Sequence, residues 1–121
     1  MYLCSYTSSQ NLTLTFDNFK FTTNENTAIA LYAATGINLT INVLGECSIS
    51  TSVNSGNIIN LSGVESTINF IGSGSMSINA GDGSDGSSGT AGGNGGYGIA
   101  VKYIMLNMSG SLSITGGDGG N

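Results

Sequence analysis

The sequence predicts an all-β fold, a right-handed parallel β-helix (β-solenoid) of about 3–4 turns. Two observations predict it. Short segments in which apolar and polar residues alternate recur along the chain, as in strands that are buried on one side. Equivalent segments return at intervals of roughly 29 residues, which is typical of a repeat architecture. The 121 residues are therefore expected to form one solenoid domain, residues 1–121, that is part of a longer array.

The alternating segments divide into three series. In chain order they are Leu12–Phe16, Phe19–Phe21, Ile29–Leu31, Leu39–Val43, Cys47–Ile49, Ile59–Leu61, Ile68–Phe70, Met76–Ile78, Ile99–Val101, Ile104–Met108 and Leu112–Ile114. The first series starts at Phe19, Cys47, Met76 and Leu112, at spacings of 28, 29 and 36 residues. The second starts at Ile29, Ile59 and Ile99, and the third at Leu39, Ile68 and Ile104. Three short strands per turn are typical of a parallel β-helix.

Stacking of the turns, about 4.8 Å apart, predicts columns of equivalent side chains. One inward column is Phe21, Ile49, Ile78 and Ile114. Two outward polar columns are Lys20, Ser48, Ser77, Ser113 and, beside it, Thr22, Ser50, Asn79, Thr115. Gly45, Gly74 and Gly110 precede strands of the first series, and we expect each to make a sharp turn with positive φ.

An antiparallel sandwich is the competing architecture. It needs Asn-Gly or Asp-Gly turns between successive strands. Such dipeptides, among them Asp82-Gly83 and Asp118-Gly119, occur only inside the glycine-rich segments, so the constant spacing favours the solenoid.

A glycine-rich insertion occupies residues 81–98. Glycine stands at every third position, at Gly83, Gly86, Gly89, Gly92, Gly95 and Gly98. This period predicts an extended, threefold, polyglycine-II-like backbone that would span about 45 Å. Ile78 and Ile99, on either side of the insertion, are expected in adjacent stretches of the solenoid, so the chain must reverse between them. Gly92-Gly93 and Gly95-Gly96 are the expected turning points. The insertion would pack beside the segment that begins at Gly116 or against a neighbouring molecule; a mobile surface loop is the alternative.

Composition limits the possible partners. The net charge is −5, and Lys20 and Lys102 are the only cationic side chains, which argues against nucleic acid. No apolar run is long enough for a membrane span. Only 7% of residues are charged, so hydroxyl, amide and backbone groups must cover the surface. That composition indicates an extracellular or cell-surface protein.

The cysteines give little further information. Cys47 alternates with Ile49 and is expected to point inward as a small apolar residue. A disulfide between Cys4 and Cys47 stays open, and two thiols without histidine make no metal site.

The runs Leu12–Phe21, Ala28–Leu31, Leu39–Gly45 and Ile71–Ile78 resemble a family of bacterial cell-surface parallel β-helix proteins labelled carbohydrate-binding domain-containing proteins. The similarity covers most of the chain from about Leu12 to Asn121. The resemblance implies a β-helix and the binding of pectin-type polysaccharide with calcium. It assigns no residue of this chain to a calcium site.

Three groups of side chains are candidate sites. Asp82, Asp85 and Asp118 could supply oxygen ligands to calcium, although Asp-Gly segments are usually turns. Tyr32, Tyr97 and Tyr103 could contact a glycan or cap the edge of the core. The polar columns could bind a sugar chain, order water at ice, or be solvated sheet faces. Sequons for glycosylation begin at Asn11, Asn38, Asn60 and Asn107.

The sequence does not indicate an enzyme, because it has no histidine and no pair of acids with an evident shared cleft. Two functions are expected instead. The first is a structural or adhesive module of a surface stalk, fibre or filament, which self-associates through its solenoid ends or glycine-rich loops. The second is a polysaccharide-binding module, with calcium as the only cofactor considered.

Overall fold

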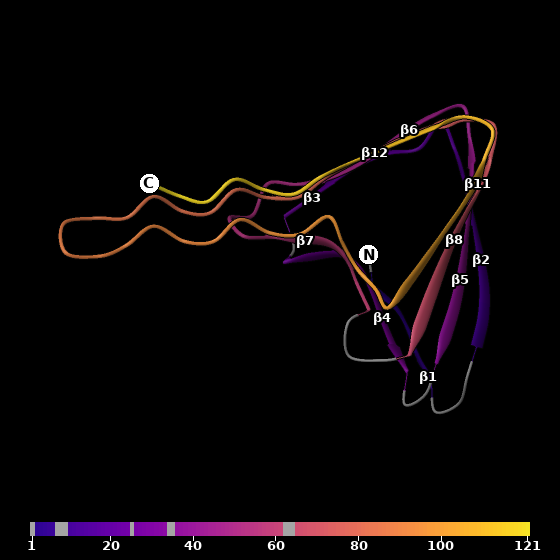
Figure 1. The fold of residues 1–121 in the computed structure, drawn as a ribbon, viewed down its shortest axis with the longest axis horizontal. Coiled ribbons are helices and arrows are strands. Elements are labelled where there is room, and N and C mark those ends of the chain that lie inside the picture. Colours follow the sequence, from indigo (N-terminus) through magenta and orange to yellow (C-terminus); the bar gives the residue numbers. More distant parts are fainter. Residues whose placement is uncertain (1, 7–9, 25, 34–35, 62–64) are drawn as a thin grey trace.

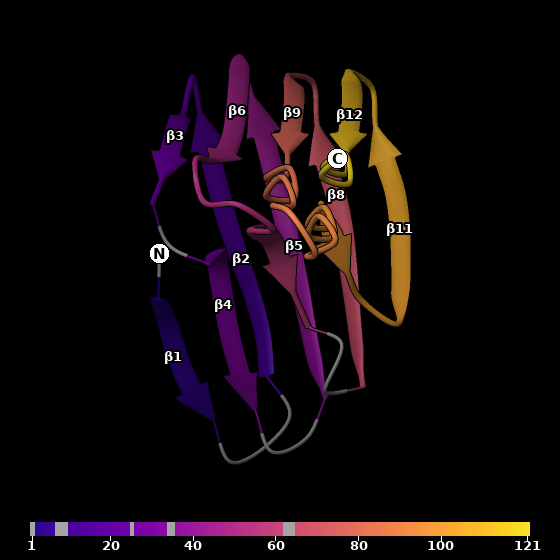
Figure 2. The same cartoon turned by 90° about the vertical axis from the view of Figure 1, so that its left-hand side faces the viewer.

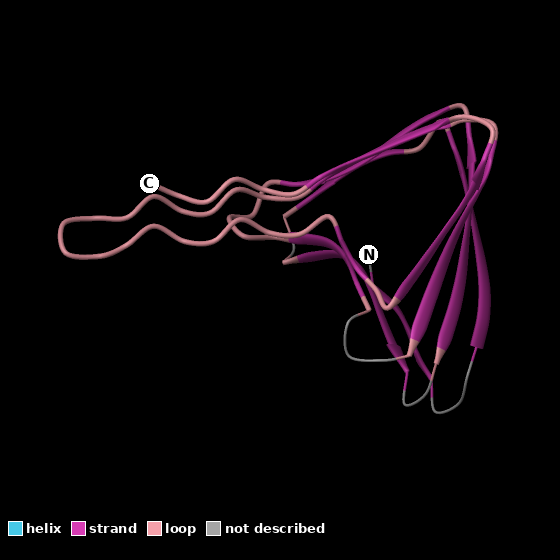
Figure 3. Cartoon of the chain, viewed as in Figure 1, coloured by secondary structure: helices cyan, strands magenta, loops and turns pink. Residues whose placement is uncertain are grey.

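The computed structural model describes the chain apart from residues 1, 7–9, 25, 34–35 and 62–64. The described residues form strands and loops with no helix (Figure 3). The strands are β1 (Tyr2–Tyr6), β2 (Gln10–Asp17), β3 (Lys20–Thr23), β4 (Thr27–Ala33), β5 (Ile37–Leu44), β6 (Glu46–Thr51), β7 (Asn57–Asn60), β8 (Ser66–Gly72), β9 (Ser75–Asn79), β10 (Ile99–Ala100), β11 (Tyr103–Met108) and β12 (Ser111–Thr115). Each predicted segment overlaps one of these strands, and β1 was not predicted.

The strands form three parallel sheets, which the chain visits in turn. The first sheet has the order β1-β4-β7-β10, the second β11-β8-β5-β2 and the third β12-β9-β6-β3. Figure 1 shows the three sheets around a common interior, and Figure 2 shows successive strands of each sheet side by side. The all-β, parallel arrangement is confirmed, and it is compatible with a parallel β-helix.

The register confirms the predicted columns. Phe21 pairs with Ile49, Ile49 with Ile78, and Ile78 with Ile114. Their outward neighbours align in the same way, from Lys20 through Ser48 and Ser77 to Ser113. A one-residue slip would turn every apolar residue of a strand outward, so the alternation fixes this register. The third series gains a member at its start, because Leu12 pairs with Leu39.

The core lies between the three sheets. In β5 every second residue, from Ile37 to Val43, is buried. Ile68 and Phe70 of β8 continue this apolar layer. The predicted inward position of Cys47 is confirmed: it is a buried free thiol, and its Sγ lies 3.3 Å from the carbonyl oxygen of Leu44. The disulfide left open by the sequence is therefore absent.

The turns before the third sheet are only partly as predicted. Gly45 has a φ of 67°. Gly74 and Gly110 do not have positive φ, so that prediction was wrong for them. They are glycines for another reason, because a Cβ on Gly74 would overlap the Gly45 carbonyl and a Cβ on Gly110 would overlap the Gly74 carbonyl. Close stacking of successive turns, rather than backbone handedness, therefore requires glycine there.

The glycine-rich residues form a bundle of three extended segments that projects from the sheets (Figure 1). We name them the outgoing segment (residues 81–86), the returning segment (92–96) and the C-terminal segment (117–121), and together the glycine bundle. Viewed nearly end-on in Figure 2, they wind as small triangles, as a threefold backbone should. The polyglycine-II prediction and the packing beside the Gly116 segment are therefore confirmed.

Hydrogen bonds connect the three segments in a cycle. Gly83 N–H donates to the Asp118 carbonyl at 2.7 Å, Gly96 N–H to the Gly81 carbonyl at 2.7 Å, and Gly117 N–H to the Gly96 carbonyl at 2.9 Å. A threefold helix has no internal hydrogen bonds, so its backbone groups must find partners on neighbouring segments. The outgoing and C-terminal segments run parallel, and the returning segment runs opposite to both.

The predicted turning points of the insertion were wrong. The chain reverses at residues 87–90, where Gly89 has a φ of 79° and Thr90 N–H donates to the Ser87 carbonyl at 2.8 Å. Gly92 and Gly95 serve a different purpose. A Cβ on either would overlap a carbonyl of the C-terminal segment.

Candidate functional site

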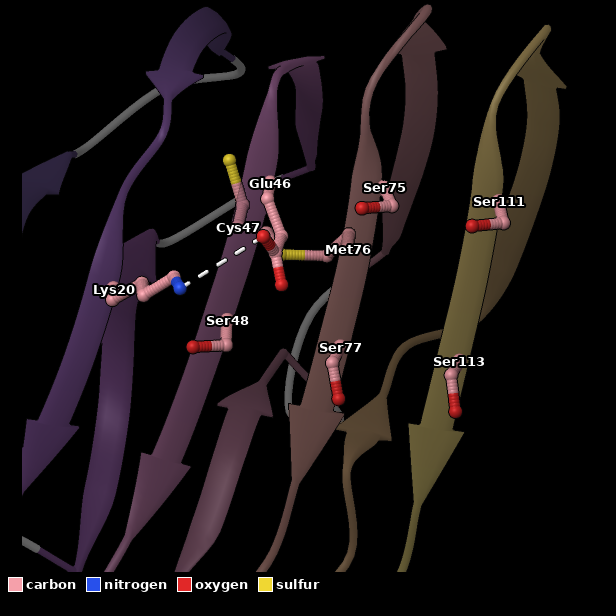
Figure 4. A pocket seen from close by; sticks show the side chains of 9 residues that line it. All are labelled: Lys20, Glu46, Cys47, Ser48, Ser75, Met76, Ser77, Ser111 and Ser113. Carbon is pink, nitrogen blue, oxygen red and sulfur yellow. Dashed lines mark ion pairs between the residues drawn. The ribbon is translucent and has the colours of Figure 1, made fainter.

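The outer face of the third sheet carries a shallow hollow of about 250 Å³ (Figure 4). Alternation along β6, β9 and β12 turns a group of hydroxyls toward solvent, and register aligns them across the strands. The lining comprises Lys20, Glu46, Cys47, Ser48, Ser75, Met76, Ser77, Ser111 and Ser113. Five of these nine residues are serines, so the hollow offers hydroxyl groups that can donate and accept hydrogen bonds.

We call the surface that lines this hollow the serine face. Its charged side chains lie at one end. Lys20 Nζ and Glu46 Oε2 are 3.9 Å apart, and both side chains are largely exposed. Such a pair contributes about 0–1 kcal/mol because solvent screens it. The rest of the face is neutral, so a bound group would be recognised by hydrogen bonds rather than by net charge.

The outward polar columns make hydrogen bonds of their own. Thr22 Oγ1 of β3 and Ser50 Oγ of β6 are 3.0 Å apart, which is the cross-strand hydroxyl contact expected of a solvated sheet face. Within β9, Asn79 Nδ2 donates to Ser77 Oγ at 3.0 Å. These hydrogen bonds therefore link β3 to β6 and one polar column to the other.

The three predicted calcium ligands lie around a second hollow of about 520 Å³, between the outgoing and C-terminal segments. Asp82 Oδ1 accepts the N–H of Asp118 at 2.8 Å, and Asp85 Oδ1 accepts the N–H of Asn121 at 3.1 Å. Two of the three carboxylates thus bind backbone of the adjacent segment. Within the part of the chain that the structure describes, no group of three or more acidic, cysteine or histidine side chains is arranged to hold a metal ion. Calcium binding stays a prediction.

The structure does not bring the rings of Tyr97 and Tyr103 into contact. Tyr97 and Tyr103 are both exposed, before β10 and at the start of β11 respectively, and no ring contact between them occurs among the described side chains. The side chain of Tyr32 lies outside the described residues. Lys102 Nζ lies 5.6 Å from the Tyr103 ring centre and 2.5 Å from Glu65 Oε2. The hydrogen bond to Glu65 raises the pKa of Lys102.

Three of the four sequon asparagines are exposed and hydrogen-bonded to a second asparagine. Asn38 Nδ2 donates to Asn11 Oδ1 at 2.9 Å, and Asn107 Nδ2 donates to Asn69 Oδ1 at 2.7 Å. Asn60 ends β7 and is half-buried. The exposed asparagines therefore already act as side-chain ladders along the sheets.

The sequence did not single out the exposed apolar surface at β11 and β12. Ile104, Leu106 and Ile114 are 45%, 63% and 42% exposed, although their column partners Ile68, Phe70 and Ile78 are fully buried. Their exposure could have been predicted, because each is the last member of its series in this sequence. We call Ile104, Leu106 and Ile114 the apolar end.

Comparison with protein-family models, curated proteins and solved structures finds no match to this chain. Among the described residues there is no helix long and apolar enough to cross a membrane.

Proposed function

We propose that this chain is a right-handed parallel β-helix, a β-solenoid, that serves as a structural or adhesive module of an extracellular stalk, fibre or filament. One observation carries the proposal: inward-facing apolar side chains repeat in register in each of the three sheets. A solenoid of this kind repeats along one axis, so additional turns lengthen it without changing its cross-section.

The chemistry of the surface supports this role. Apart from Lys20, the two outward columns of the third sheet are built from Ser, Thr and Asn, and only 7% of all residues are charged. Contacts made by a neutral hydroxyl surface change little with ionic strength, because there is little charge for salt to screen. The glycine bundle adds a lateral projection whose backbone groups form hydrogen bonds with one another.

Electron microscopy of the purified chain tests the proposal. Rods or filaments of uniform width are the expected result. Separate compact particles at every concentration would contradict the structural role.

Polysaccharide binding is the second candidate, and the serine face is the observation that favours it. Neutral hydroxyls in a regular array can bond to the hydroxyls of a sugar chain. Ser77→Ala combined with Ser113→Ala should then weaken retention on an immobilised pectin-type polysaccharide. Ser87→Ala at the tip of the bundle is the matched control. Equal retention of both variants, with or without calcium, would contradict this role.

A further inference from the structure

We infer that the apolar end binds the opposite end of a second copy of this chain, head to tail and in register, with β11 against β2 and β12 against β3. This inference rests on the proposed structural function and names the contact through which modules join.

The apolar end is an interrupted column rather than a scattered surface. β11 and β12 are edge strands of their sheets, and each pairs on one side only. Leu106 stands 63% exposed next to a Phe70 that is fully buried. Edge strands also present unpaired backbone N–H and C=O groups, which a further parallel strand would satisfy. The surface therefore lacks both apolar cover and hydrogen-bond partners.

The other end of the molecule offers a complementary surface. β2 and β3 are the opposite edge strands of the same two sheets. Their inward residues Leu12, Leu14 and Phe21 are only half-buried. They stand in the columns of Ile104, Leu106 and Ile114 respectively, as the register through the intervening strands shows. Stacking a second copy would place an apolar residue on each member of the apolar end.

The outward columns accept the same contact. Ser113 would stand beside Lys20 of the next copy, and Thr115 beside Thr22, so these pairs of β12 and β3 bring no like charges together. A serine beside Lys20 already occurs within one copy, where Ser48 pairs with Lys20.

The arrangement of the sheets favours this partner over a twofold dimer of apolar ends. Turning one copy over would keep only one sheet on its own kind and exchange the other two; if the second sheet is kept, the first and third are exchanged. β12, with five residues, would then face β10, with two. A head-to-tail copy keeps every sheet on its own kind, so all three ladders continue.

Disulfide trapping between two variants that each carry one introduced, exposed cysteine tests the register. Lys20→Cys copies are mixed with Ser113→Cys copies under oxidised glutathione, with Cys4→Ser in every chain and Cys47 left in place as a buried thiol. Adjacent parallel strands lie about 4.8 Å apart, within the range of roughly 4.4–6.8 Å that a disulfide spans. Ser111→Cys is the matched control, because Ser111 is also exposed on β12 but lies two residues from the predicted partner. We expect the 20–113 pair to cross-link several-fold faster than the 20–111 pair. Circular dichroism confirms that each variant is folded.

The outcomes separate this inference from the proposed function. Filaments in which both pairs cross-link equally, or neither does, would overturn the in-register contact and leave the structural role standing. A particle that stops at two copies would overturn the head-to-tail contact. A chain that stays monomeric and forms no filament would overturn both.

Discussion

Glycine at individual positions has a steric cause that can be tested. A Cβ on Gly95 would overlap the Gly117 carbonyl, whereas the nearest atom to a Cβ on Gly119 is 3.9 Å away. Gly95→Ala should therefore destabilise the glycine bundle by about 1–3 kcal/mol, and Gly119→Ala should have little effect. Amide exchange of Gly117 and Gly120 measures the difference. Equal protection in both variants would contradict the steric argument.

Phe70 and Leu106 are neighbours in one apolar column but differ in solvent exposure. Phe70 is fully buried and its neighbour Leu106 is 63% exposed. Phe70→Ala should lower the free energy of unfolding by about 3–5 kcal/mol, because it leaves a cavity. Leu106→Ala should cost far less. Denaturant unfolding at a concentration where the chain is monomeric provides the comparison, and similar losses would show that the interior of the column is not as packed as the structure has it.

Lys102 provides a prediction for pH. Its pKa lies above the ordinary value of 10.5 because of the hydrogen bond to Glu65. A raised pKa means that the pair stabilises the fold fully below pH 10.5, and that this contribution is lost as pH rises through the pKa of the folded state. Glu65→Gln should lower the pKa of Lys102. Titration of its side chain by NMR gives the answer, and an unchanged pKa would exclude Glu65 as the cause.

At the scale of the element, the C-terminal segment should hold the insertion in place. It accepts the N–H groups of Gly83 and Gly86 and donates to the returning segment. Deleting residues 116–121 should expose residues 81–98 to proteolysis while β5 and β8 stay protected. Protection of the insertion after this deletion would show that the outgoing and returning segments are stable alone.

The strands and their register follow from the sequence because alternation and a near-constant interval leave one consistent alignment. The residue pairs from Phe21 to Ile114 are as predicted. The predicted position of the reversal was wrong because paired glycines are typical of turns. Steric crowding against another segment also requires glycine, and this is the cause at Gly92 and Gly95. Such crowding depends on a segment far away in the chain. β1 was missed since Tyr2–Tyr6 lacks a clear alternation.

The candidate site was predicted only in part. The serine column of the third sheet follows directly from register, but the hollow that it lines depends on three adjacent strands. Asp82, Asp85 and Asp118 do gather in one place, as their positions in the repeat suggest. Their bonds to backbone amides could not be foreseen, because these depend on how the segments pack.

At the scale of the whole molecule, the length of the filaments should depend on the apolar end. Leu106→Lys places a charge on the apolar end and should shorten filaments strongly, because a buried charge without a partner is costly. Ser87→Lys, at the tip of the bundle, adds the same charge elsewhere. Filament lengths by electron microscopy decide the matter. Equal shortening in both variants would point to net charge rather than to the end contact.

The cycle of hydrogen bonds in the glycine bundle also sets an order of synthesis and closure. The outgoing and returning segments leave the ribosome first, yet Gly83 and Gly86 donate to Asp118 and Asn121. Each of those acceptors is translated 35 residues after its donor (118 − 83 and 121 − 86). The sheets can therefore assemble turn by turn during translation, whereas the projection closes only after residues 117–121 have left the ribosome.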